Sequence, residues 1–358
     1  FIKKEILPYH KKWEENGVVS KELWIKAGHA GLLCPNVPEN YGGIGGDFRF
    51  NIIIAEELAK AGVTGPGFAV HSDIVAPYII NYCSEKQKKY YLPKMISGEI
   101  ITAIAMTEPG TGSDLQNIKT KATISTDTVT LNGSKTFITN GQNANLVLVV
   151  AKTDTSQKAK GISIILCEEN NKGFKRGKNL EKIGMKAQDT SELYFEEVIL
   201  PKENILGNAG QGFSQLMDEL PQERLSIAVT AISAAEAALN WTIAYVKERT
   251  AFDKKIIEFQ NTKFTLAKLK ADITVGRAFI DRCIKEHINN NFSAEDGAIA
   301  KLWCTDLQFK VMDECLQLHG GYGYMKEYPI ARAFLDSRVQ RIYGGTNEIM
   351  KEIISRNL

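Results

Sequence analysis

The sequence lacks most of the features that mark secreted, metal-binding or membrane-spanning proteins. Its 358 residues include six cysteines and five histidines, but no Cys-x-x-Cys pair and no zinc-like cluster. Scattered cysteines of this kind are typical of a reducing compartment, where thiols stay free or buried. No apolar run approaches the roughly 18–20 residues that cross a membrane. We therefore expect no membrane span and no bound metal.

An excess of charge of either sign is also absent. The chain carries 44 basic and 42 acidic residues, a net charge of +2, so no strong field favours nucleic acid or a membrane surface. The opening segment FIKKEILPYHKKW is charged and helical in pattern, unlike a secretory signal. It begins with Phe1 instead of an initiator Met, which is compatible with a missing leader or a missing first helix.

Three segments of the chain differ in their residue patterns. Residues 1–102 repeat apolar residues at helical spacing, as in KELWIKAGHAGLL and FNIIIAEELAKAG. Residues 103–208 contain short β-branched runs, such as NLVLVVAK and GISIILC, broken by turn residues. Residues 209–358 are helical again, with long helices expected around 261–288 and 294–318. The prediction is an α+β protein with an N-terminal helical domain, a central antiparallel β-barrel or sandwich domain and a C-terminal four-helix bundle.

Glycine-rich stretches mark the loops of this arrangement. PENYGGIGGDF (38–48) lacks the G-x-G-x-x-G pattern and follows no strand, which favours a turn over a dinucleotide site. AMTEPGTGSD (105–114) offers hydroxyls and approachable backbone, and is either a ligand loop or an ordinary polar turn. CLQLHGGYGYMKEYPIAR (315–332) is compatible with a helix C-cap at Gly320, and His319 is more typical of a packed histidine than of a catalyst.

Taken together, these motifs resemble the acyl-CoA dehydrogenase family almost from end to end. AMTEPGTGSD is similar to the family's first signature, and KERTAFDKKIIEFQ (247–260) is similar to its Arg…Phe…Gln segment. The stretches ELPQERL and GGTNEIMKE most resemble the long-chain acyl-CoA dehydrogenase branch. The second signature is matched at Gln317, Gly320, Gly321, Gly323, Glu327, Arg332 and Asp336.

The resemblance implies an FAD-dependent enzyme that oxidises acyl-CoA thioesters to trans-2-enoyl-CoA in fatty acid β-oxidation. In the family, a carboxylate removes the α-proton while the β-hydrogen leaves as hydride to flavin N5. The resemblance also implies an electron-transfer flavoprotein as electron acceptor and a homotetramer built as a dimer of dimers. The compartment would be the cytoplasm of a bacterium or the mitochondrial matrix of a eukaryote.

The base of this reaction is expected at Glu223. Many family members carry a glutamate where this sequence has Gly344, whereas the long-chain and isovaleryl branches take it from the helix that begins PQER here. Pro221 predicts the start of that helix, which puts Glu223 near its third position, and Leu220 cannot complete a capping box. Glu223 then shares an apolar helix face with Ile227, where a carboxylate is either paired or functional.

Two effects are expected to compete over the pKa of Glu223. A helix N-terminus favours the carboxylate, whereas desolvation by a bound acyl chain favours the neutral acid. We expect burial to win, because a useful base needs a pKa near the working pH. Arg224 is adjacent but faces elsewhere on the helix, which makes it a poor partner within the helix.

The other site residues follow from the resemblance. The backbone N–H of Gly344 is expected to hold the thioester carbonyl. Asp253 stands where the family usually has glycine, close to Arg249, whose guanidinium suits a diphosphate. The implied cofactor-binding residues are Ile104, Met106, Thr107, Gly112, Ser113, Phe137, Ile138, Thr139, Arg249, Phe252, Gln260, Gln317, Gly320, Gly321, Thr346, Asn347 and Glu348. The resemblance implies that a neighbouring subunit's FAD is reached by Arg249, Gln260, Gln317 and Gly321. The implied substrate-binding residues are Ser113, Ser214, Pro221, Gln222, Arg224, Gly344 and Gly345.

Alternative functions stay open at this point. A branched or short acyl-CoA is a close alternative substrate, because the isovaleryl branch uses the same base position. An acyl-CoA oxidase is disfavoured by the length of the chain. A non-catalytic flavoprotein with an assembly or scaffold role would need no base, and Glu223 argues against it.

Overall fold

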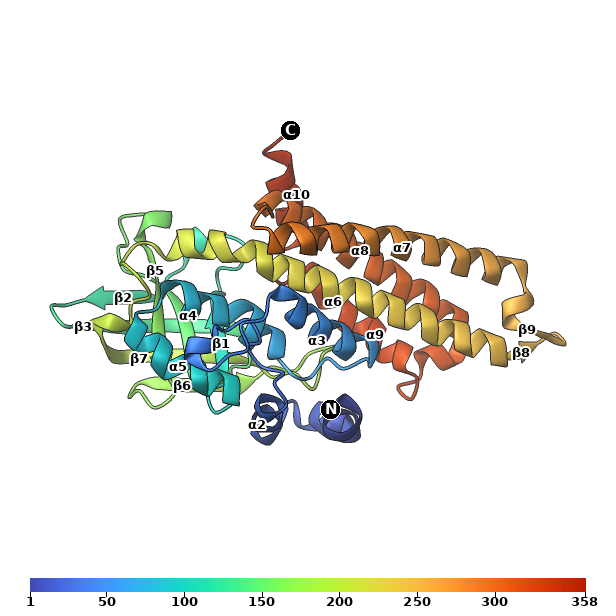
Figure 1. Cartoon of the computed structure of the whole chain (residues 1–358), viewed down its shortest axis with the longest axis horizontal. Coiled ribbons are helices and arrows are strands. Elements are labelled where there is room, and N and C mark those ends of the chain that lie inside the picture. Colours follow the sequence, from blue (N-terminus) through green and yellow to red (C-terminus); the bar gives the residue numbers. More distant parts are fainter. The chain divides into compact units, whose positions relative to one another are not determined.

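The computed structural model describes all residues from Phe1 to Leu358, which form two compact units (Figure 1). Unit 1 contains the N-terminal helices and the sheet, and unit 2 contains the C-terminal helices. Unit 1 comprises Phe1–Asn51, Gly65–Lys182 and Lys186–Glu219. Unit 2 comprises Ile52–Thr64, Ile183–Met185 and Leu220–Leu358.

Helix α5 of the N-terminal region has a recognisable cap at each end. Ser84 and Gln87 form a capping box at the start of α5, and Gly98 ends that helix with a positive φ of 78°. No other residue fits at position 98, because a Cβ there would collide with the carbonyl of Trp24. The helices are α1 (Leu7–Asn16), α2 (Lys21–His29), α3 (Phe48–Lys60), α4 (Ala76–Tyr82) and α5 (Glu85–Ser97).

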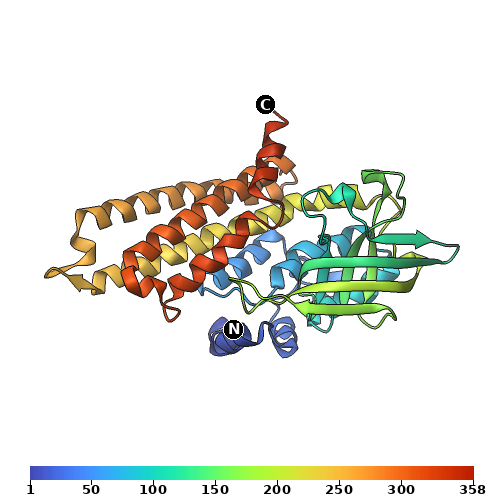
Figure 2. The same ribbon diagram turned by 180° about the vertical axis from the view of Figure 1, so that it is seen from behind.

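The sheet of unit 1 has seven strands in the order β1-β4-β2-β3-β7-β6, with β5 paired to β4. Its strands are the green and yellow-green arrows in Figure 2. Four of its pairings are antiparallel as expected, whereas β1 runs parallel to β4, and β2 meets β4 in parallel at one residue pair. The strands are β1 (Thr102–Ala105), β2 (Lys121–Ile124), β3 (Thr128–Thr139), β4 (Leu146–Lys152), β5 (Ile162–Glu168), β6 (Phe174–Asn179) and β7 (Thr190–Pro201).

Strand β4 is buried on both faces, which explains its continuous apolar sequence. Leu146, Leu148 and Val150 pack in the core shared with α4 and α5. The alternate residues Val147 and Val149 pack in a second core formed by the other strands. The sheet therefore separates two apolar layers within unit 1.

Long helices dominate unit 2 (Figure 1). They confirm the helices expected around 261–288 and 294–318, and the predicted helix–sheet–helix α+β fold is confirmed as a whole. A short hairpin of β8 (Thr250–Ala251) and β9 (Lys254–Lys255) joins the first two of these helices. The helices are α6 (Gly212–Glu248), which begins in unit 1, α7 (Gln260–Ile288), α8 (Ala294–His319), α9 (Pro329–Ser337) and α10 (Asn347–Ser355).

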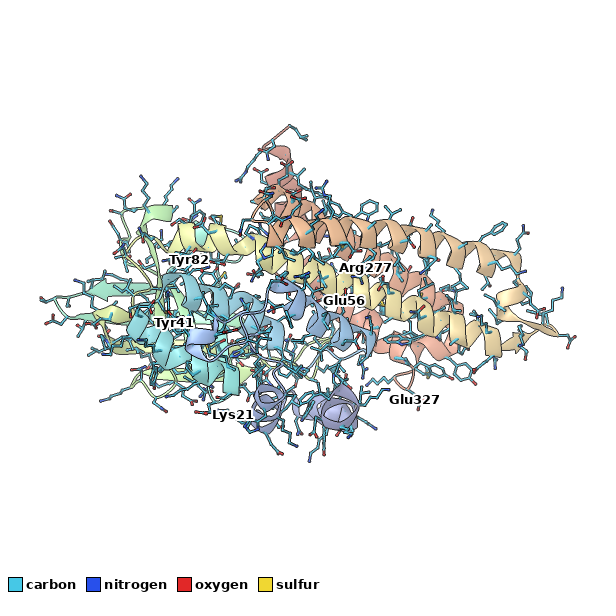
Figure 3. All side chains as sticks on the ribbon, viewed as in Figure 1. Lys21, Tyr41, Glu56, Tyr82, Arg277 and Glu327 are labelled. Atoms are coloured by element: carbon cyan, nitrogen blue, oxygen red, sulfur yellow. The ribbon has the colours of Figure 1, made fainter.

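Half-buried ion pairs connect the second half of α3 to the other helices of unit 2. Arg277 of α7 donates to Glu56 of α3 at 2.6 Å and to Glu236 of α6 at 2.8 Å, and Figure 3 labels Glu56 and Arg277. The next turn is held by Arg332, which donates to the carbonyl of Gly62 at 2.9 Å. Arg332 of the second family signature therefore has a structural contact.

The predicted helix start at Pro221 is wrong, because α6 begins at Gly212 and Pro221 lies inside it. Proline cannot donate to the carbonyl four residues earlier, at Met217, but this part of α6 is exposed and water can replace the donor. By length and composition alone, α6 could also cross a membrane, which contradicts the expectation that no apolar run approaches that length. However, 61% of its most apolar 18-residue stretch is buried inside the protein.

Candidate active site

The loop after β1 is built around a buried ion pair. Glu108 accepts a hydrogen bond from Lys135 Nζ at 2.9 Å and from the backbone N–H of Thr120 at 2.9 Å. Burial opposes the ionisation of Glu108, but Lys135 and these donors outweigh it and lower the pKa of the carboxyl. The ion pair therefore fixes the turn that the motif AMTEPGTGSD forms after β1.

A bulge in β3 brings the two predicted flavin-binding segments of unit 1 together. Thr136 N–H donates to the carbonyl of Thr107 at 3.0 Å, and Lys135 Nζ donates to the carbonyl of Met106 at 2.8 Å. The next residue, Phe137, has a φ of +60° at the register shift between β3 and β7. Its ring is 65% exposed. An exposed aromatic ring on strained backbone is an arrangement that a binding site explains.

These residues suit an FAD ring. A Cβ at Gly112 would meet no atom within 4 Å, so the loop leaves open space beside the exposed hydroxyl of Ser113. Phe137 offers an aromatic face, and the loop offers backbone and hydroxyl hydrogen-bonding groups. The other predicted residues of this set, Ile104, Ile138 and Thr139, lie on β1 and β3. Ser214 lies on α6 in the same unit, where its hydroxyl donates to the carbonyl of Gln211.

In unit 2 the carboxyl group of Glu223 lies beside Gly344. A Cβ at residue 344 would lie 3.5 Å from Glu223 Oε1 and would collide with Cδ1 of Ile227, one turn further along α6. Gly344 also has a φ of +63°, which disfavours any other residue. The structure thus brings the predicted base and the predicted oxyanion position together although they are 121 positions apart in the sequence.

The side chain of Glu223 is half-buried, and its carboxyl lacks a full set of hydrogen bonds. Its Oε2 is inaccessible to solvent and has no hydrogen-bond partner. Burial raises the pKa of Glu223 from 4.5 to about 7, and the positive charges of Arg224 and Lys301 oppose this rise only in part. Because Glu223 lies in the interior of α6, the helix N-terminus does not stabilise its charge, and the expected competition with the helix dipole does not arise.

The neighbours of Glu223 on α6 contact other helices of unit 2. Arg224 is 5% exposed and its Nε lies 3.4 Å from the carbonyl oxygen of Gly344, so it does face the same loop as Glu223. Gln222 Oε1 lies 2.9 Å from His287 Nε2 on α7. Pro221 packs closely against Gly297 of α8, where an added Cβ would lie 3.3 Å from the proline.

The loop from Gly344 to α10 is held by a residue that sequence reasoning missed. Lys301 of α8 is completely buried and donates to the carbonyl of Gly345 at 2.7 Å and to Asn347 Oδ1 at 2.9 Å. Thr346 caps α10 by accepting from a backbone N–H, while Glu348 is exposed in its first turn. A lone lysine among small and apolar residues was the signal in the sequence.

A second set of predicted cofactor residues lies around the C-terminal end of α6, in unit 2. Its members are Arg249, Phe252, Gln260, Gln317, Gly320 and Gly321, and all are exposed. The helix from Glu223 to its last residue spans roughly 37 Å at 1.5 Å per residue, so this set cannot reach the surroundings of Glu223 within one chain. Gly320 caps α8 as predicted, and His319 is buried and stacked on Tyr245, as expected of a packed histidine.

The β8–β9 turn at this end has an unusual backbone. Phe252 and Asp253 have φ values of +54° and +57°, and this two-residue turn normally favours Asn or Gly. The structure thus accommodates Asp253 in the conformation for which the family uses glycine. The ring of Phe252 is 88% exposed.

Comparisons with known proteins agree along the whole chain. Family models match the acyl-CoA dehydrogenase N-terminal domain at residues 1–99, the middle domain at 103–198 and the C-terminal domain at 210–358. The mitochondrial long-chain specific acyl-CoA dehydrogenase of Sus scrofa is 52% identical over 360 residues, which cover 100% of this chain and 84% of that protein. The mitochondrial isovaleryl-CoA dehydrogenase of Solanum tuberosum is 34% identical and covers 100% of this chain and 88% of its own length.

A solved structure is similar at the level of the complete fold. The crystal structure of acyl-CoA dehydrogenase from Geobacillus kaustophilus superposes with a TM-score of 0.98 at 48% identity, and the match covers 100% of this chain and 94% of that one. Three matched domains, high identity and a shared fold lead to one conclusion. The chain belongs to the acyl-CoA dehydrogenase family and is an FAD-dependent oxidoreductase that dehydrogenates acyl-CoA.

Proposed function

We propose that this enzyme oxidises long-chain acyl-CoA thioesters to trans-2-enoyl-CoA in fatty acid β-oxidation, with Glu223 as the base. The observation that carries the assignment of the base is the carboxyl of Glu223, which lies next to Gly344 and whose Oε2 is inaccessible to solvent and has no hydrogen-bond partner. The identity of 52% to a long-chain enzyme, against 34% to an isovaleryl enzyme, supports the chain length.

The proposed reaction uses this chain's groups in a defined order. The N–H of Gly344 binds the thioester carbonyl and stabilises the charge that develops on its oxygen. Glu223, with a pKa of about 7, is about half ionised at neutral pH and accepts the α-proton from the substrate. Bound FAD supplies the hydride acceptor. A bound acyl chain excludes the remaining water and strengthens both interactions.

Glycine at position 344 fits this division of roles. The backbone N–H needs no side chain, and the positive φ and the side chain of Ile227 leave no room for one. A glutamate there would compete for the space that the carboxyl of Glu223 faces. The base on α6 and the glycine in the loop therefore form one consistent arrangement.

The other proposals concern assembly, partners and organisation. Within unit 2, the predicted cofactor residues around the last residue of α6 lie far from Glu223 and from the loop at Gly344, which supports an FAD site shared between subunits of a homotetramer. We propose an electron-transfer flavoprotein as acceptor, and a bacterial cytoplasm or a mitochondrial matrix as compartment, according to the source. The proposed domains are 1–102, 103–208 and 209–358.

A branched acyl-CoA is the second candidate substrate, because the isovaleryl branch shares the base position and an isovaleryl enzyme matches the whole chain. The test is an anaerobic titration of the purified flavoprotein with straight acyl-CoAs of four to eighteen carbons and with isovaleryl-CoA, followed by flavin absorbance. Stoichiometric bleaching that is best with long chains supports the proposal. Preferential bleaching by isovaleryl-CoA transfers the assignment to the branched substrate. If no substrate bleaches the flavin, the proposed role of Glu223 as a base is refuted and a scaffold function is favoured.

A further inference from the structure

Lys301 is a buried cation that the reaction proposed above does not use. Its side chain is completely buried in α8, and its two hydrogen-bond acceptors, the carbonyl of Gly345 and Oδ1 of Asn347, are uncharged. Burying an ammonium group without a bonded carboxylate is costly. A methionine of similar length would pack there without this cost, so the charge itself needs an explanation.

The contacts of Lys301 limit the conformational freedom of the loop at Gly344 and Gly345. Gly344 and Gly345 have φ values of +63° and +89°, and two successive glycines are the most flexible backbone a loop can have. Lys301 Nζ holds the carbonyl of Gly345 at 2.7 Å, and Arg224 Nε lies 3.4 Å from the carbonyl of Gly344. Two buried cations, from α8 and α6, thus face successive carbonyl groups of the loop.

The same helix also fixes the residue that follows the loop. Asn347 Nδ2 donates to Asp306 Oδ1 at 2.9 Å and to Thr305 Oγ1 at 3.1 Å, while its Oδ1 accepts from Lys301. Lys301, Thr305 and Asp306 occupy one and the next turn of α8. The start of α10 and the peptide of Gly345 are therefore attached to one rigid helix.

The charge of Lys301 also acts on Glu223. It opposes the effect of burial on the carboxyl, second only to Arg224. Burial in turn lowers the pKa of Lys301 to about 8, so the lysine is charged at neutral pH. The charged groups that act on Lys301 are Arg224 of α6, Asp306 of α8, Glu348 of α10 and Arg341 of the 3-10 turn Arg338–Arg341. Tyr343 also lies near Glu223, and burial raises the pKa of its phenol.

We propose that Lys301 is a positioning residue, which holds the Gly344–Gly345 loop against Glu223 and whose charge favours the carboxylate form of that base. This inference rests on the proposed function, because it assigns Lys301 a part in the same site. It predicts two separable effects: a geometric one, from the hydrogen bonds, and an electrostatic one, from the charge.

The test compares Lys301→Gln, Lys301→Arg and the control Lys310→Gln by rapid-mixing measurement of flavin reduction by acyl-CoA from pH 6 to 9. Lys310 lies on the same helix, is 43% exposed and pairs with Asp272. We expect Lys301→Gln to slow reduction about 10–100-fold through misplacement of the loop. The ionisation that controls the rate should move up by about one pH unit. Lys301→Arg should keep the wild-type ionisation but react more slowly, and Lys310→Gln should match the wild type.

The outcomes separate this inference from the proposed function. Wild-type protein that no acyl-CoA reduces would refute the proposed function itself. Wild-type reduction together with an unchanged rate and pH profile in Lys301→Gln would refute only the role of Lys301. If Lys301→Gln does not yield a folded flavoprotein by circular dichroism and FAD content, Lys301→Arg decides. Slower reduction with unchanged ionisation then supports the proposal, and wild-type kinetics overturn it.

Discussion

Replacing Glu223 with glutamine should lower the activity of the enzyme and raise its stability. The amide keeps the size of the side chain but cannot accept the α-proton, so flavin reduction should fall by about 10²–10⁴, the usual range for a positioned base. The same change removes a carboxyl that is costly to ionise in this buried position. The Glu223→Gln variant should therefore be less active and more stable than the wild type at neutral and alkaline pH.

The size of the stability effect follows from the pKa of Glu223. A rise from 4.5 to about 7 corresponds to about 3 kcal/mol at about 1.4 kcal/mol per unit. The folded state binds the proton more tightly than the unfolded state. The free energy of unfolding therefore falls as the pH rises from about 4.5 to about 7, and the loss stays constant above that. The buried amide has its own desolvation cost, so we expect a net gain of about 1–3 kcal/mol above pH 7.

The assay combines anaerobic flavin reduction with thermal unfolding of the flavoprotein at pH 5 and pH 8. The control is Glu352→Gln on α10, because Glu352 is 59% exposed and forms only a surface pair with Arg356. This control should change stability by less than about 0.5 kcal/mol and leave reduction unchanged. A Glu223→Gln variant that reduces FAD normally would refute Glu223 as the base. A loss of activity with equal destabilisation at both pH values would refute the argument from burial.

Two further predictions concern the loop and the shared cofactor site. Gly344→Ala should lower the free energy of unfolding more than Gly31→Ala, because both glycines have positive φ but only a Cβ at residue 344 would meet Ile227. Thermal unfolding compares the two variants, and equal losses of stability would show that Ile227 imposes no constraint. Arg249→Gln should weaken FAD retention without moving the pH dependence of reduction, because Arg249 is exposed at the far end of α6; full FAD content after gel filtration would contradict its role in a shared site.

Local patterns in the sequence were enough to predict the helices of the bundle and the order of helices and sheet. The apolar repeat of α7 and α8 depends on residues three or four positions apart, which the sequence displays directly. The same kind of pattern placed Glu223 on an apolar face. The resemblance to the acyl-CoA dehydrogenase family then predicted its chemical role, because whole signatures of the family are matched here with the same spacing between residues.

Proline misled the prediction because the context of a helix decides whether proline starts it. Pro221 is a good first residue, but Gly212 to Leu220 already form helix before it, so Glu223 lies away from any helix end. Its pKa is therefore governed by burial, and burial depends on which residues surround the carboxyl in three dimensions.

The pairing of Glu223 with Gly344, and the attachment of the Gly344 loop to Lys301, exist only in the tertiary structure. A lysine among Ala298, Cys304 and Thr305 on one face of α8 is as unusual as a carboxylate on the apolar face of α6. The pattern alone marks each as buried and polar. It does not reveal their partners, because those contacts join segments 44 to 121 positions apart, and only the packing of α6, α8 and α10 brings such segments together.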